Sequence, residues 1–98
     1  MTLMPGHLAE EQRKILGAVA LAYRRVMRAP QEPAATRAEE ARLAQKRQSE
    51  ALSAATAEYR RLTPFATGDK LAVSGEVNRM IAAAINTNPE WFWHGPDA

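Results

Sequence analysis

The chain has 98 residues, a formal net charge of +2 and no cysteine. This length suits one small domain, and the missing thiols exclude disulfide frameworks, thiolate zinc sites and cysteine nucleophiles. No apolar run is long enough for a transmembrane helix, and the N-terminus lacks the pattern of a signal peptide. We therefore expect a cytoplasmic protein with no membrane partner.

The first expected helix covers residues 8–28. Its apolar residues recur at three- and four-residue spacings along one face. Its acids lie near the start and its bases near the end, as the helix dipole favours. Pro30 ends the helix, because the residue before a proline avoids the helical region. The apolar positions are Leu8, Ile15, Leu16, Val19, Ala22, Tyr23, Val26 and Met27.

The second expected helix covers residues 36–62, which contain neither Gly nor Pro and are rich in strong helix formers. Thr36 and Glu39 have the spacing of a capping box. The short connection over residues 29–35 makes the two helices antiparallel neighbours. With a tight turn there, residues 55–62 should project beyond the first helix. In the first half of the long helix, Ala41 and Ala44 occupy its best buried stripe, where small side chains allow another helix to approach closely.

A third helix is expected over residues 74–86, with Ser74 as its N-cap and Asp69 as an earlier alternative. Asn88 followed by Pro89 then predicts a fresh, short helical turn. The fold class is therefore all-α. An antiparallel helical hairpin in residues 1–62 is joined to a C-terminal helix and a short aromatic turn in residues 63–98, within a single small domain of residues 1–98.

Trp91, Phe92 and Trp93 supply half of the aromatic residues in three consecutive positions. Neighbours on a helix diverge by about 100°, so a short turn cannot direct all three side chains inward. Tryptophan is enriched at the anchors of protein interfaces, and at least one of the three is expected to be exposed or to meet a partner. The alternative is that Trp91 and one neighbour close a small core.

The segment from Ser74 to Gly95 contains the run IAAAINTNPEWFWHG at residues 81–95. It resembles the last two helices of phage-repressor-type helix-turn-helix domains, which often end in an I-A-x-A-L helix, a short S-P-E-W/Y-L turn and a glycine. The resemblance implies a similar local helix pair and suits a phage or mobile-element origin. The DNA-reading part of that family needs two helices separated by a turn. Residues 36–62, which should hold it, form one Gly-free helix, so no DNA-reading residue carries over.

Residues suited to catalysis are sparse. His7 and His94 lie near opposite ends of the chain, without a carboxylate at a fixed spacing, and this pattern does not indicate a metal site. No Gly-rich phosphate loop is present. We therefore expect no enzyme activity, no catalytic residue, no metal and no cofactor.

Basic residues gather at the ends of the two long helices. Phosphate contacts need such groups, which makes nucleic acid an alternative partner. In an antiparallel hairpin, however, each cluster also meets acids of the other helix, and this favours a solvated, ion-paired surface. The residues concerned are Arg24, Arg25 and Arg28 at one end and Arg60 and Arg61 at the other.

The sequence thus predicts a non-enzymatic helical module for protein–protein interaction, acting as an inhibitor, an adaptor or an assembly component. It would bind an unidentified protein or form a homo-oligomer. The expected contact residues are Trp91, Phe92, Trp93, Ala41 and Ala44. The alternative is a dimeric regulator that binds nucleic acid through the basic helix ends.

Overall fold

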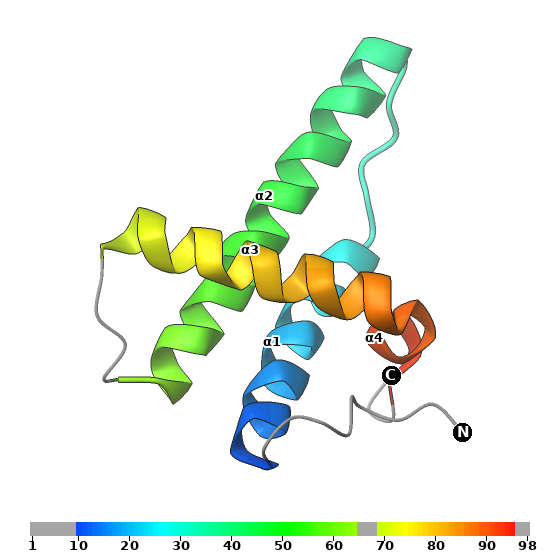
Figure 1. Ribbon diagram of the computed structural model, residues 1–98. Helices are drawn as coiled ribbons and strands as arrows, with labels where there is room; N and C mark the ends of the chain where they lie inside the picture. The colour runs from blue at the N-terminus through cyan, green and yellow to red at the C-terminus, as the bar shows by residue number, and fades with distance from the viewer. Residues whose placement is uncertain (1–9, 65–68, 96–98) are drawn as a thin grey trace.

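In the computed structural model, which describes residues 10–64 and 69–95, all regular structure is helical (Figure 1). The helices are α1 (Glu10–Arg28), α2 (Arg37–Leu62), α3 (Lys70–Thr87) and α4 (Pro89–His94). The predicted all-α class is confirmed. The helices α1 and α2 run in opposite directions as a pair, and α3 crosses α2 before the chain reaches α4. Residues 8 and 9, predicted to open the first helix, lie outside the described part.

Side-chain caps set the helix starts. The hydroxyl of Thr36 accepts a hydrogen bond from the Glu39 N–H at 3.1 Å, and the Glu39 carboxylate accepts one from the Ala35 N–H at 2.9 Å. The predicted capping box is therefore present, with its return bond one residue earlier than usual. In the same way, the Asn88 side chain accepts from the Trp91 N–H at 3.0 Å and opens α4.

The predicted start of the third helix at Ser74 is wrong. The Asp69 carboxylate accepts a hydrogen bond from the Ala72 N–H at 2.8 Å, so α3 begins at Lys70. Asp69 was the earlier alternative. Its side chain satisfies an N–H that would otherwise have no partner at the helix start, and Ser74 lies in the second turn.

The core combines apolar side chains from all four helices. Alanine supplies several of its members, and the largest fully buried side chains are Phe92, Val19 and Val77. Small side chains let the helices approach closely, at the cost of little buried area per residue. The buried apolar residues are Leu16, Val19, Ala20, Tyr23, Ala51, Ala55, Val73, Val77, Ile81, Ala84, Trp91 and Phe92.

The register of the hairpin differs from the prediction. Arg47 donates hydrogen bonds to the carbonyl of Met27 at 2.9 Å and to the carbonyl of Ala29, so the end of α1 lies beside the middle of α2. The expected overhang of residues 55–62 is wrong, because in this register they lie alongside the first half of α1, and residues 37–46 project instead (Figure 1). This register results from the connection over residues 29–36, which runs alongside α2 to its N-terminal end and does not form a tight turn after α1.

Proline explains that course. Pro30 and Pro33 lack the N–H that a helix interior needs and keep the residues before them out of the helical region, and eight extended residues can span up to about 26 Å. The radius of gyration is 14.4 Å, compared with roughly 13 Å for a compact domain of this length. The projecting half of α2 adds to this value.

Candidate interaction surface

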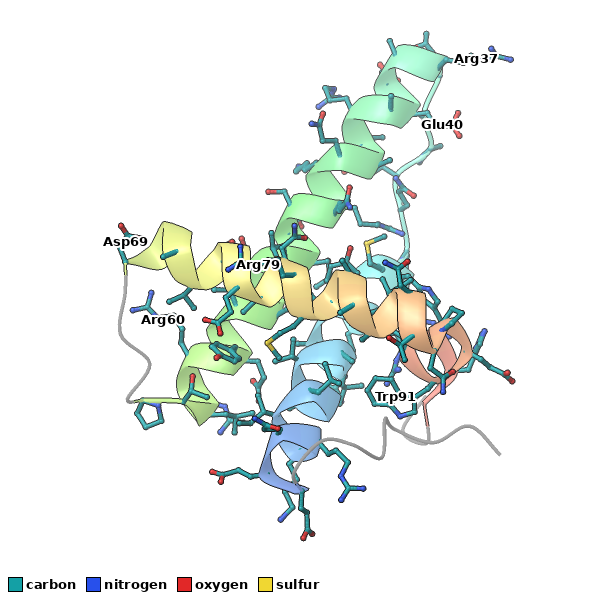
Figure 2. All side chains as sticks on the ribbon, in the orientation of Figure 1. Arg37, Glu40, Arg60, Asp69, Arg79 and Trp91 are labelled. Atoms are coloured by element: carbon teal, nitrogen blue, oxygen red, sulfur yellow. The ribbon has the colours of Figure 1, made fainter. Side chains whose placement is uncertain are left out.

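We call the first half of α2, residues 37–50, the arm; its residues 37–46 project beyond the end of α1, and Arg47 bonds its base to that end. Only Leu43 and Arg47 are half-buried in the arm, and all its other residues are exposed. Figure 2 shows Arg37 and Glu40 near its tip, away from the other helices. A helix of this length is marginal in water when isolated, so the arm depends on its cap, its composition and its continuity with the packed second half.

One face of α2 passes directly from the core into solvent. Ala55 and Ala51 have no exposed surface. Further toward the N-terminus, steps of three and four residues lead through Gln48 to Ala44 and Ala41, which are exposed. Residues at these spacings share one side of a helix. The two predicted alanine contacts therefore lie together on an open face of small side chains.

A groove of about 210 Å³ lies between the arm and the connecting segment. Val26, Pro30 and Leu43 give it apolar lining, and it also carries charges of both signs, from Glu32, Glu50, Lys46 and Arg47. Its volume suits one or two apolar side chains of a partner.

The structure places the aromatic turn mainly in the core. Trp91 is 4% exposed and Phe92 is fully buried, while Trp93 is half-buried. The ring of Phe92 meets that of Tyr23 edge to face at 5.7 Å between centroids, and Trp93 lies 5.0 Å from Phe92. Figure 2 shows Trp91 directed from α4 toward α1. The structure therefore agrees with the alternative in which Trp91 and one neighbour, here Phe92, close the core. Trp93 packs against Phe92 at the edge of that core.

Two of the predicted basic residues hold α4 in place. Arg24, only 3% exposed, donates to the carbonyl of Phe92 at 2.5 Å. Arg28 donates to the carbonyl of Trp93 and also lies 3.2 Å from Nδ1 of His94. The last carbonyls of a helix have no partner within it, and a helix of one and a half turns cannot bond most of them. The sequence analysis did not predict this role. The shortness of the expected helical turn was the available signal, because a short helix leaves carbonyls that need donors from elsewhere.

The remaining arginines lie near Glu58. Arg61 forms an ion pair with Glu58 one turn earlier on α2. A hydrogen bond from Arg61 holds the pKa of the Glu58 carboxyl below its ordinary value, and the nearby charge of Arg25 acts in the same direction. Arg60 is exposed. The structure therefore pairs Arg61 with Glu58 and directs Arg24 and Arg28 to α4, so the five arginines have separate roles.

Comparisons with protein-family models, with curated proteins and with solved structures found no match for the chain. Among residues 10–64 and 69–95, no three histidine, aspartate or glutamate side chains gather in a way that could hold a metal ion. No helix in those same ranges combines the length and apolarity needed to cross a bilayer. The geometry of the arm is thus the main guide to function.

Proposed function

We propose that the protein is a non-enzymatic helical interaction module that binds a macromolecular partner, or another copy of itself, through the arm of residues 37–50. The observation that carries the proposal is the exposure of this half of α2, which projects beyond the end of α1. A helix held out from a small core offers a partner its tip and the side that faces away from the connecting segment. The groove beside it, lined by both apolar and charged residues, and its alanine face are open to contact.

The aromatic and basic residues that the sequence predicted as contacts give less support to the proposal than the arm does. Trp91 and Phe92 are buried, so they would contact a partner only after α4 leaves the core. For the nucleic-acid alternative, Arg24 and Arg28 are already bonded to carbonyls of α4. That alternative predicts retention on duplex DNA that falls steeply with salt, and a lack of retention at low salt would remove it.

The setting of the proposed module follows from composition. A chain without cysteine suits a reducing compartment, and we place the module in the cytoplasm. Its small size and its repressor-like tail suit a phage or mobile element, in which such a protein would serve as an inhibitor, an adaptor or an assembly component.

Glutamate substitutions on the arm test the proposal. Ala41→Glu and Ala44→Glu put a charge on the open face, while Ala83→Glu does the same at an exposed position of α3. Binding is measured by retention of host proteins on the immobilised chain and by light scattering for self-association. We expect both arm variants to lose the binding that Ala83→Glu keeps, with unchanged helix content. Equal binding by all three variants would place the contact elsewhere.

A further inference from the structure

Two opposite charges lie two turns apart on one edge of the alanine face of the arm. Glu40 is exposed near the tip (Figure 2), and Arg47 is half-buried at the base. Residues seven positions apart return to nearly the same side of a helix, and here that side borders Ala41 and Ala44. The open face therefore has an acidic group beside one end and a basic group beside the other.

Neither charge meets its opposite within the part of the chain that the structure describes. Arg47 donates hydrogen bonds to two main-chain carbonyls at the end of α1, and neither it nor Glu40 forms an ion pair there. A guanidinium group carries five N–H donors, so Arg47 has donors left for a carboxylate. Its own Glu40 is too distant, because seven residues of helix separate the two by about 10 Å along the axis.

We propose that the partner of the arm is a second copy of this chain, whose arm packs on it in antiparallel orientation with Glu40 of each copy beside Arg47 of the other. The inference rests on the proposed function, because it names the partner of the same surface. A two-fold axis between positions 43 and 44 exchanges positions 40 and 47, so a single symmetric contact forms both ion pairs.

Charge complementarity decides the orientation. In a parallel pair of arms, each residue lies beside its own copy, which brings Glu40 to Glu40 and Arg47 to Arg47. Like charges repel across such a contact, whereas the antiparallel pair joins opposite charges at both ends. The order of acid and base along the arm is thus complementary to its own reverse.

The small side chains of the face allow these charges to meet. Packed helices have axes 8–10 Å apart, depending on the side chains at the contact, and the exposed Ala41 and Ala44 allow the closest approach. The arm stands clear of α3, so a second helix can lie along it (Figure 1). Two arms bury less area than the roughly 1,600 Å² of a standard interface. We therefore expect a weak dimer that forms at high protein concentration.

Sedimentation equilibrium of the full chain, from about 10 μM to 1 mM, tests the second copy as partner. The wild type should pass from monomer to dimer and should dimerise less at high salt, which screens exposed charges. Glu40→Arg turns both ion pairs into repulsions and should raise the dissociation constant at least about tenfold. Glu11→Arg makes the same change in the first turn of α1 and should behave like the wild type. A wild type that stays monomeric throughout, or equal dissociation constants for the two variants, would overturn the inference.

Single cysteines test the orientation, because the chain has none of its own. A disulfide needs Cα atoms within about 7 Å of each other. Position 44 lies next to the two-fold axis, so Ala44→Cys should cross-link two copies under mild oxidation. The two copies of position 48 lie about 13 Å apart along the helix axes, so Gln48→Cys should not. Cross-linking of both variants would indicate a parallel pair, and cross-linking of neither would exclude contact at the axis; either result contradicts the inference.

Retention of host proteins separates this inference from the proposed function. A monomeric wild type that retains a host protein, and loses it in Ala44→Glu, would overturn the second copy as partner and leave the arm as the binding surface. Failure of both self-association and retention would overturn both proposals. Circular dichroism of each variant confirms that its helix content is that of the wild type.

Discussion

At the scale of single residues, arginine side chains do the work of helix C-caps in this fold. Helices often end with a glycine that lets the chain bond the last carbonyls, but α1 ends at Arg28 followed by Ala29 and Pro30. Arg47 from α2 satisfies the carbonyls at that end. Charged donors from a neighbouring helix thus satisfy carbonyls and also set how the helices sit against one another.

Substituting Arg24 and its neighbour Arg25 in turn distinguishes the effect of a carbonyl contact from that of positive charge alone. Arg24→Gln removes a buried donor and leaves the Phe92 carbonyl without its partner, and such a loss costs about 1.5–3 kcal/mol for a bond to a charged group. Arg25→Gln removes an exposed guanidinium and should shift stability by less than about 0.5 kcal/mol. Urea unfolding followed by circular dichroism measures both. Equal effects would mean that the Arg24 contact adds nothing.

At the scale of elements, α2 is one helix stabilised in two ways. Its second half is held by burial, with Ala51, Ala55 and Thr56 in the interior. Apart from the bonds of Arg47 at its base, its arm is held by local terms, which are the Thr36 cap, the acids Glu39 and Glu40 in the first turn, and a composition of strong helix formers. Stability within the helix should therefore fall toward its N-terminus.

Hydrogen exchange can measure that gradient. Amides of residues 40–46 should exchange much faster than those of residues 51–59 in the wild type. Thr36→Ala, which removes a cap worth about 1 kcal/mol, should speed exchange in the arm and leave the second half unchanged. Ser53→Ala is the matched control, since it removes an exposed hydroxyl from the middle of the helix. Faster exchange along the whole of α2 in Thr36→Ala would contradict a locally stabilised arm.

The elements also show what sequence reasoning can reach. Helix number, the C-terminal end of α1, the ends of α2 and the caps at Thr36 and Asn88 were predictable, because they depend on spacing and on residues a few positions apart. The hairpin register was not, because it depends on how far two prolines extend the connection and on a bond between Arg47 and Met27. The burial of Trp91 and Phe92 was one of two open alternatives, since only the tertiary fold places a surface opposite them.

At the scale of the whole molecule, the principal extents of 46 × 37 × 19 Å describe a flat, elongated body. Its core is thin because alanine fills much of the contact between α2 and its neighbours. Where α3 crosses α2, burial raises the pKa of Tyr59, and the charge of Glu76 on α3 adds to the effect. The alanine face of α2 is thus covered near this crossing, at Ala51 and Ala55, and is open at Ala41 and Ala44.

Two leucine substitutions on the same face of α2 test this division. Ala51→Leu inserts extra volume where no surface is exposed, and overpacking of this kind costs about 1–3 kcal/mol. Ala44→Leu, two turns away on the exposed part of the face, should change the free energy of unfolding by less than about 0.5 kcal/mol. Thermal and urea unfolding of the two variants gives the comparison. If Ala44→Leu destabilised the monomer as much as Ala51→Leu, the arm would be packed in solution and unable to offer its face to a partner.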